Sequence, residues 1–331
     1  MTMTGAQISV GGENLIDHVD NEGVIAAYAG GSPFNVARAL GRQGARVRYI
    51  SPISTDQWGD MLADILAESG VDLCGGRNDR PTTMARVRVH NRIPDYLFER
   101  DDTAERRVTE AALAASIGTD TCLLHTGSLA LGDGADANVW EAVVANAYRR
   151  GIFVALDPNV RLSVIGDAQG YRNRIRRIAG HVHLIRLSDE DLAGLFPGKT
   201  EEAAMDALKS HTPARAIVLT RGAGGLSAWR DGQRIDLPAT PVTAIKDTVG
   251  AGDTFMATLL AQIADLGHDP VGRLAAPGAG VFARMLARAS VAAALTCERD
   301  GCDPPTRSEL DEAWAARARA AASPEPRSRR L

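Results

Sequence analysis

The sequence contains few cysteines and no apolar run long enough to cross a membrane. Its four cysteines form no CxxC pair and are not at zinc-like spacing from a histidine, so neither a disulfide framework nor a zinc site is expected. No apolar stretch approaches the ~20 residues of a membrane span, and no basic region precedes an apolar core at the N-terminus. These absences predict a cytoplasmic protein with reduced thiols, no membrane partner and no metal ligands of its own.

Excess charge and aromatic residues are also lacking. Lys and Arg number 37 against 41 Asp and Glu, a formal net charge of −4. A near-neutral chain has no bulk attraction for nucleic acid or an anionic membrane surface, so neither is expected as a partner. Aromatic residues make up only 5% of the chain, which gives little support for stacking on a purine acceptor.

Short apolar runs alternate with amphipathic helical patterns along most of the chain. Strands are predicted at 7–12, 46–51, 121–125, 152–157, 182–188 and 215–220. Helices are predicted at 33–43, 57–69, 136–150, 201–210, 251–266 and 281–298. Each strand but the last is followed by a loop and a helix, the βαβ order that builds a parallel sheet with helices on both faces. One large α/β domain is the simplest interpretation.

Two segments alternate with period two and predict β-hairpins. Residues 82–100 are interrupted by "NRIPD", and residues 226–237 carry an Asp-Gly turn. The first hairpin is flanked by helix–strand units, so we expect it to form a flap over one edge of the sheet. Its apolar positions are Met84, Val87, Val89 and Leu97. Because a hairpin of this size is marginal alone, these positions predict that two flaps pack together in a homodimer.

The segment "DTVGAGDTF" (247–255) places small residues at the start of a helix. These residues are Gly250, Ala251 and Gly252. Apolar spacing over 255–266 is helical, and the unpaired N–H groups and dipole at a helix N-terminus attract an anion. Asp253 would repel a bound phosphate, which makes sense if it takes a proton from a nucleophile aimed at that phosphate. The alternative is that Asp253 or Asp247 only caps the helix.

Other nucleotide-binding patterns fit this chain less well. Gly250 and Gly252 match the first two glycines of GxGxxG, but Phe255 takes the third position and no strong strand precedes them. A second glycine cluster at 222–225 leads into a hairpin, where the dinucleotide motif needs a helix. No Walker A motif occurs. An NAD-dependent dehydrogenase is therefore a weak alternative.

The two signatures of a known family are present in order. "DTVGAGDTF" resembles the C-terminal signature of the ribokinase-like sugar kinases, or PfkB carbohydrate kinase family, and "GGSPFNVARALGRQG" (30–44) resembles its N-terminal signature. Segments similar to the fructokinase branch are "GGENLIDHV" (11–19), "FERDDTAERRVT" (98–109), "HTGSLAL" (125–131), "DPNVR" (157–161) and "LSDEDL" (187–192). The resemblance extends from about residue 8 to residue 306.

The resemblance implies a three-layer α/β/α core with a mainly parallel central sheet and a small β-sheet lid. It further implies transfer of the ATP γ-phosphate to a primary hydroxyl of a sugar, with Mg²⁺ bound to the ATP. Asp253 matches the catalytic base of the family, and residues 250–252 match its anion hole. Some relatives need a monovalent cation near Asp247, and the use of K⁺ by this chain is left open.

The same resemblance suggests boundaries within the chain. A single kinase domain is expected over residues 1–320, with a lid formed by about 12–29 and 73–101. Residues 321–331 are expected to form a flexible tail.

On the sugar side, the matching residues are Asp17, Gly31, Asn35, Arg100 and Arg161. A carboxylate at Asp17 can accept two hydroxyl hydrogen bonds, and the Asn35 amide can both donate and accept. Gly31 lets the substrate approach the backbone. Arg100 would reach from the flap, and Arg161 follows a strand at the edge where ligands of α/β sheets collect. Each assignment has an alternative. Asp17 could be a solvated loop carboxylate, and Gly31 and Asn35 could form an ordinary helix cap. Arg100 could be an outward-facing strand charge, and Arg161 could form an ion pair that braces its loop.

On the nucleotide side, the matching residues are Ser188, Thr220 and Gly222. Thr220 and Gly222 correspond to a pattern beneath the ATP phosphates and ribose, although a plain turn would also explain the glycine. Ser188 and Asp191 occupy the ends of what is commonly an Asn-x-x-Glu element linked to magnesium. Both differ from the commonest residues, so no direct metal ligand is predicted.

Taken with these matches, the sequence predicts an ATP-dependent sugar kinase, with fructose as the preferred acceptor. Kinases of the same fold for 2-keto-3-deoxygluconate, ribose or a nucleoside are alternatives. A non-catalytic sugar sensor is another, although the intact Asp253 argues against it.

Overall fold

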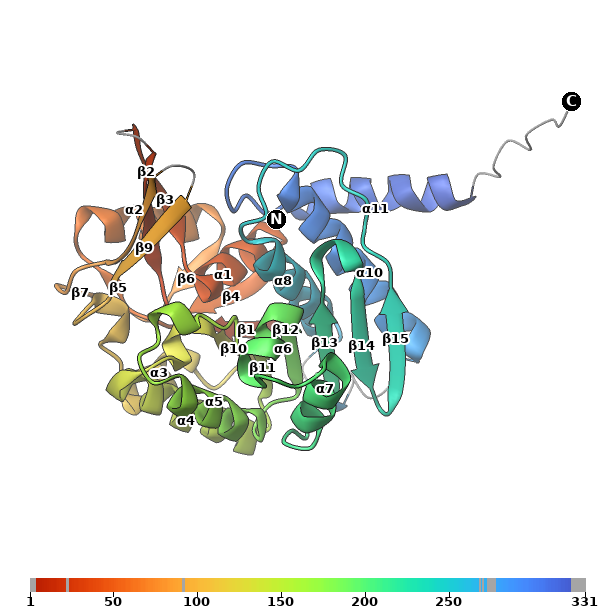
Figure 1. Ribbon diagram of the computed structural model, residues 1–331, viewed down its shortest axis with the longest axis horizontal. Coiled ribbons are helices and arrows are strands. Elements are labelled where there is room, and N and C mark those ends of the chain that lie inside the picture. Colours follow the sequence, from red (N-terminus) through yellow and green to blue (C-terminus); the bar gives the residue numbers. More distant parts are fainter. Residues whose placement is uncertain are drawn as a thin grey trace, which may run out of the picture.

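A nine-stranded sheet between two layers of helices forms the core of the protein (Figure 1). The computed structural model describes residues 4–21, 24–90, 93–267, 269, 271–272 and 278–322. Strand order is β15-β14-β13-β12-β11-β10-β1-β4-β6. The seven strands from β13 to β6 pair in parallel, and β14 and β15 add an antiparallel edge. The predicted three-layer α/β/α class is confirmed.

Apart from β6, each strand of the central sheet overlaps a predicted strand or hairpin. They are β1 (Thr4–Val10), β4 (Ala45–Tyr49), β6 (Val71–Leu73), β10 (Thr121–Gly127), β11 (Phe153–Asp157), β12 (Leu184–Ser188), β13 (Ala216–Thr220), β14 (Leu226–Arg230) and β15 (Gln233–Leu237). Neighbouring residues of one strand face opposite cores. Phe153 contributes to one core and Val154 to the other, which explains why these strands are apolar throughout.

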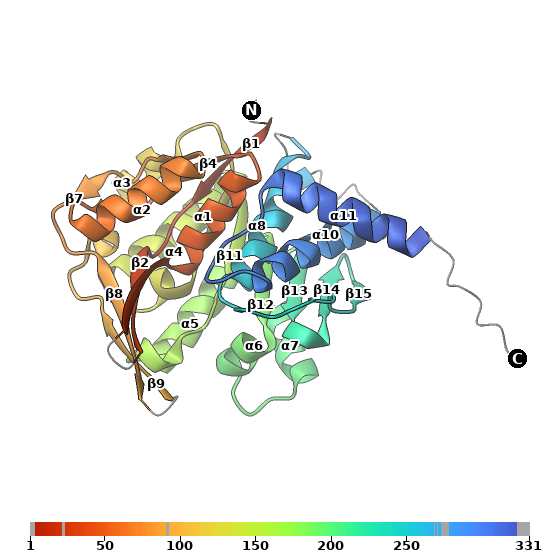
Figure 2. The same cartoon turned by 90° about the horizontal axis from the view of Figure 1, so that it is seen from above.

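Each helix layer covers one face of the sheet (Figure 2). One layer contains α1 (Ser32–Arg42), α2 (Gln57–Glu68), α8 (Ala251–Ala264) and α10 (Ala279–Cys297), with α11 (Arg307–Ala322) packed on α10. The other contains α3 (Glu110–Ile117), α4 (Gly134–Arg149), α5 (Ala168–Ala179), α6 (Asp189–Leu195) and α7 (Glu201–Lys209). Residues 280–297 of α10 are long and apolar enough to span a membrane, but this helix packs along α8 in the core.

A separate four-stranded sheet stands beside the core and forms the lid. Its strands, in the order β3-β2-β8-β9, are β3 (Val24–Gly30), β2 (Leu15–Asn21), β8 (Thr83–His90) and β9 (Ile93–Glu99). A short pair, β5 (Ile53–Ser54) and β7 (Arg77–Asn78), lies in a sheet of its own. The predicted hairpin at 82–100 therefore does leave the central sheet. Residues 323–331 of the predicted tail lie outside the described residues.

Candidate active site

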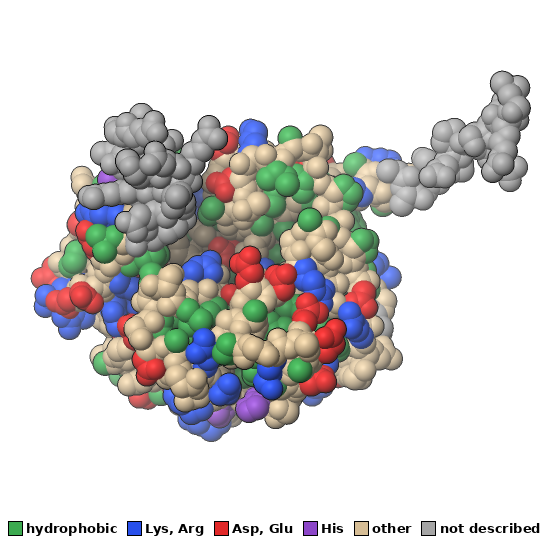
Figure 3. Space-filling view, viewed as in Figure 1, with side chains coloured by type: hydrophobic (Ala, Val, Ile, Leu, Met, Phe, Trp, Pro, Cys, Tyr) green, Lys and Arg blue, Asp and Glu red, His purple; other side chains and the backbone are tan. Residues whose placement is uncertain are grey.

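A cavity of about 410 Å³ lies between the lid and the carboxyl ends of the parallel strands. Acidic and basic side chains gather around this hollow in the face shown in Figure 3. Lid residues that line it include Leu15, Asp17 and Phe98, and core residues include Glu13, Ser32, Asn35, Ser128, Asn159, Arg161 and Asp253. We call this space the acceptor cavity. Ligands of open α/β sheets collect at this edge.

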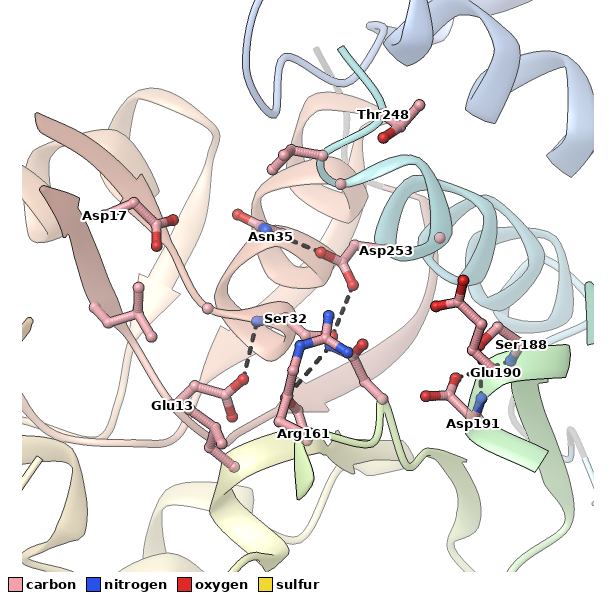
Figure 4. Close-up of a pocket in the computed structure, with 18 of the residues that line it drawn as sticks. Glu13, Asp17, Ser32, Asn35, Arg161, Ser188, Glu190, Asp191, Thr248 and Asp253 are labelled. Atoms are coloured by element: carbon pink, nitrogen blue, oxygen red, sulfur yellow. Dashed lines mark hydrogen bonds between the residues drawn. The ribbon is translucent and has the colours of Figure 1, made fainter. Parts of the chain in front are cut away.

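Asp253 points from the first turn of α8 toward the start of α1 (Figure 4). The Ser32 hydroxyl donates to Oδ1 at 2.7 Å, and the Asn35 amide Nδ2 donates to Oδ2 at 2.9 Å. Burial raises the pKa of Asp253, while these two hydrogen bonds and the nearby Arg186 hold it down. The result is an oriented carboxylate that is more basic than an exposed aspartate, which suits proton abstraction.

Backbone geometry explains the glycines before Asp253. Gly250 caps α8 with φ +74°, a left-handed conformation that favours glycine, and a Cβ there would lie 2.1 Å from the Cys302 sulfur. A Cβ on Gly252 would lie 2.7 Å from Nη1 of Arg186. Ala251 begins the helix between them. Small residues at this helix start let an anion approach its N–H groups.

Two further carboxylates, Asp17 and Glu13, line the acceptor cavity (Figure 4). Asp17 extends from β2, and burial raises its pKa to about 6. Glu13 is almost fully buried, accepts from the Ser32 backbone N–H at 3.0 Å, and has its pKa raised by burial to about 7. Gly31 has φ +104°, and a Cβ there would lie 2.5 Å from the Glu13 carbonyl oxygen. The start of α1 is therefore packed directly on Glu13.

The two arginines expected on the sugar side occupy different places. Arg161 lines the acceptor cavity. Arg100 does not line it. The buried Arg100 guanidinium instead donates to Glu105 at 2.8 Å and lies 3.5 Å from an oxygen of Asp136. The expectation that Arg100 reaches into the sugar site is not met in this structure, because neighbouring carboxylates hold its charged end.

Ser188 and Asp191 form a capping box at the start of α6. Asp191 accepts from the Ser188 N–H at 2.8 Å and from the Val160 N–H at 2.6 Å. Both carboxylate oxygens thus bind backbone, which connects α6 to the loop after β11. Both residues line the acceptor cavity. Within the described part of the chain, no group of three or more His, Cys, Asp or Glu side chains is placed to hold a metal ion.

A second cavity of about 410 Å³ lies on the other side of the α8 start. Thr220 and Gly222 line it, together with apolar residues that include Leu226, Pro241, Val242, Ile245, Phe255 and Ala293. We call it the nucleotide cavity, because a slot with apolar walls fits a flat base. The two cavities share Arg186, Thr248 and Gly252. The glycine-rich helix start therefore lies between the two cavities.

Sequence reasoning assigned no role to Arg186, Glu13 or Ser32. A signal for Arg186 was present, because it is the charged residue within the apolar run 182–188. Glu13 lies inside a quoted motif, but nothing in the sequence indicates that its side chain is buried beneath Ser32.

The fold and the site define an α/β protein with two adjoining cavities at the glycine-rich start of α8. The model for the pfkB family carbohydrate kinases matches residues 13–309. The chain therefore belongs to the PfkB family of carbohydrate kinases.

Similarity to individual proteins covers most of the chain. A fructokinase of Rhizobium leguminosarum bv. trifolii is 34% identical over 258 residues, which are 76% of this chain and 78% of that protein. Fructokinase-2 of Oryza sativa subsp. japonica is 30% identical over 76% of this chain and 78% of its own length. The crystal structure of a fructokinase from Xylella fastidiosa with bound ATP superposes with a TM-score of 0.87 and 24% identity, covering 94% of this chain and 99% of the other.

Proposed function

We propose that this carbohydrate kinase transfers the γ-phosphate of Mg·ATP to a primary hydroxyl of fructose. The observation that carries the proposal is the position of Asp253. Its carboxylate lies in the acceptor cavity, one residue from Gly252, which lines both cavities. A base at this junction can receive a proton from an acceptor hydroxyl while the N–H groups of residues 250–252 receive the phosphoryl group.

The hydrogen-bonding character of the acceptor cavity favours a neutral polyol. Glu13 and Asp17 offer carboxylate oxygens, and the buried Oδ1 of Asn35 has no hydrogen-bond partner within the described ranges. Such acceptors match the hydroxyl donors of a sugar. An acidic acceptor such as 2-keto-3-deoxygluconate would bring a further negative charge toward these two carboxylates, which Arg161 alone would oppose at this end of the cavity if Arg100 stays paired with Glu105. Fructose is therefore preferred over the acidic sugar.

The reaction is an in-line displacement. The acceptor hydroxyl loses its proton to Asp253 as its oxygen bonds to the γ-phosphorus, and the bond from that phosphorus to the β–γ bridging oxygen breaks. The products are a sugar phosphate, ADP and a proton. Mg²⁺ enters with the nucleotide as part of the substrate and neutralises phosphate charge. Arg161, which lines the acceptor cavity, binds the sugar or the transferring group in this proposal.

Relatives support the choice of ligands. The curated relatives named above are fructokinases, and a fructokinase of Vibrio cholerae was crystallised with fructose, ADP and a potassium ion. We include K⁺ binding by the loop around Asp247 in the proposal. Asp247 accepts from the N–H groups of Val249 and Gly301 and so organises that loop. A homodimer joined through the lids, working in the cytoplasm, completes the proposal.

A coupled ADP-release assay tests the proposal. The acceptors are fructose, ribose, 2-keto-3-deoxygluconate, glucose, tagatose and adenosine, each with and without K⁺. We expect kcat/KM for fructose to exceed the others by at least ~10-fold, or about 1.4 kcal/mol of transition-state discrimination. Faster turnover of the acidic sugar would overturn the choice of fructose. Saturable sugar binding without turnover of any acceptor would instead indicate a sensor.

A further inference from the structure

Arg186 is the charged residue shared by the acceptor and nucleotide cavities. It extends from β12 with its guanidinium held between the two neighbouring strands. Nη1 donates to Oδ2 of Asp157 on β11 at 2.8 Å, and Nη2 donates to the Thr220 hydroxyl on β13 at 2.7 Å. Only 9% of Arg186 is exposed. The cation is therefore fixed in place at the junction of the two cavities.

The guanidinium lies against the backbone of the glycine-rich helix start. A Cβ on Gly252 would be 2.7 Å from Nη1, 2.8 Å from Nη2 and 3.0 Å from Cζ of Arg186. Any side chain at position 252 would therefore displace the arginine. An anion bound by the N–H groups of residues 250–252 lies beside this cation, where a charge-assisted hydrogen bond can form.

Arg186 retains donors that its protein contacts do not use. A guanidinium carries five N–H groups, and the bonds to Asp157 and Thr220 use two of them. Its Nε is buried and has no hydrogen-bond partner among the residues described. Nη1 and Nη2 are the atoms of the guanidinium nearest to Gly252, and each keeps one further N–H group. A phosphoryl oxygen in the junction would accept from these groups.

The charges around the junction require a cation when phosphate arrives. The carboxylates of Asp157, Asp191 and Asp253 all act on Arg186 and raise its pKa. Burial raises the pKa of Asp157 to about 6, although Arg186 opposes this shift. Phosphate oxygens entering this set of carboxylates would be repelled without a fixed positive charge.

We propose that Arg186 is a catalytic residue that binds the γ-phosphoryl oxygens of ATP, and that Asp157 and Thr220 are positioning residues for its guanidinium. The proposal rests on the proposed kinase reaction. As the acceptor oxygen bonds to phosphorus and the bond to ADP breaks, the equatorial oxygens carry the charge to which the free N–H groups of Arg186 donate. The competing explanation is a purely structural tie between β11, β12 and β13.

Arg186→Gln separates these explanations through nucleotide binding. Calorimetry with Mg²⁺ compares ADP with a non-hydrolysable ATP analogue. Because only the analogue has a γ-phosphoryl group, we expect its affinity to fall about 10-fold while that of ADP changes less than about twofold. We expect kcat to fall by roughly 10²–10³-fold, with KM for the sugar within about threefold. A structural tie would weaken both nucleotides equally or neither.

Matched variants complete the test. Arg174 is a partly buried arginine on α5 that donates to the Gly132 carbonyl at 2.7 Å and to Asn138 at 2.9 Å, and it lines neither cavity. Arg174→Gln should leave the affinities for the ATP analogue and for ADP as they are in wild type. If Arg186→Gln does not fold, Thr220→Val removes one anchor of the guanidinium and should still reduce analogue affinity more than ADP affinity. If the folded variant bound the ATP analogue as tightly as wild type does, the proposal would be overturned. This binding measurement does not depend on which sugar is the acceptor.

Discussion

Asn35 and Asp253, which lie 218 positions apart in the chain, are joined by a 2.9 Å hydrogen bond from Nδ2 to Oδ2. This bond connects the first turn of α1 to the first turn of α8, two helices that pack against each other. Because the NH₂ group faces Asp253, the carbonyl Oδ1 of the same amide is left as an acceptor. A single side chain thus orients Asp253 and keeps a second polar atom to which the described residues supply no hydrogen bond.

Replacement of Asp253 by Asn tests the role of the base. The variant keeps the size of the side chain but cannot take a proton, so we expect kcat to fall by roughly 10²–10⁴-fold. ATP affinity should stay the same or rise slightly, because a negative charge near the γ-phosphate is lost. The change removes no helix cap, because the N-cap of α8 is Gly250 and not Asp253. Steady-state kinetics and ATP titration measure both effects, and turnover within about threefold of wild type would refute the assignment.

Ser32→Ala should move the pH dependence of catalysis. The Ser32 hydroxyl donates to Asp253 and lowers its pKa, so removal of the hydroxyl raises that pKa. Since the base acts when ionised, the acid limb of the kcat/KM profile should shift to higher pH. Ser116→Ala serves as the control, because the half-buried Ser116 lines neither cavity and its hydroxyl donates to the Cys74 and Ala112 carbonyls. An unshifted acid limb in Ser32→Ala would show that Asp253 does not set it.

Glu13 predicts a pH-dependent stability. Burial raises its pKa from 4.5 to about 7, so the folded protein binds this proton more tightly than the unfolded chain. Its stabilising contribution is therefore complete below pH 4.5 and is lost as pH rises through about 7. The slope from this group is at most about 1.4 kcal/mol per pH unit. Urea unfolding between those pH values should give a shallower decline for Glu13→Gln than for wild type.

Glu141 provides a control, because its contribution to stability changes with pH in the opposite direction to that of Glu13. Arg177 lowers the pKa of Glu141, so Glu141 stabilises the fold above its unfolded pKa and loses this effect in acid. Glu141→Gln should leave the decline toward neutral pH in place. Asp17 and Asp157, whose pKa values are raised to about 6, contribute in the same direction as Glu13. Identical slopes for wild type and Glu13→Gln would contradict the prediction.

The lid predicts a homodimer. Leu97 on β9 is 60% exposed and Tyr28 on β3 is 53% exposed, whereas Met84 is buried. The side chains of Val87 and Val89 lie outside the described residues. Large apolar side chains on a marginal sheet favour association, so Leu97→Asp should lower the apparent mass in sedimentation equilibrium by about half. A wild-type monomer at micromolar concentration would remove the prediction.

The regular helices and strands could be predicted because their buried faces produce a periodic spacing of apolar residues in the sequence. The apolar runs that became β10 to β13 are buried on both faces, and the helices α1, α2, α4, α7, α8 and α10 match predicted patterns. The short strand β6 and the helices α3, α5, α6 and α11 were not predicted. α5 is rich in arginine, and α6 has only seven residues, so neither gave a clear apolar stripe.

The candidate site was predictable only where a residue type implies its own chemistry. Asp253 and the glycines beside it could be interpreted from a helix start, and the structure places them with Asn35 in one cavity. The contact between Ser32 and Glu13 could not be predicted from the sequence, because it depends on how β1 and α1 pack against each other. The ion pairs of Arg100 were equally invisible, since Asp136 lies 36 positions away on another element.

The division of the two cavities along the chain has a consequence for inheritance. The described residues that line the nucleotide cavity lie between Arg186 and Cys297, whereas the lid and half of the residues that line the acceptor cavity precede Arg161. In Figure 1 the lid strands are red to orange and the start of α8 is cyan. A crossover within α5 would therefore exchange the lid together with about half of the acceptor cavity and keep every described residue of the nucleotide cavity. On the proposed function, such an exchange alters the choice of acceptor and leaves the nucleotide site intact, provided that Ser32 and Asn35 remain to hold Asp253.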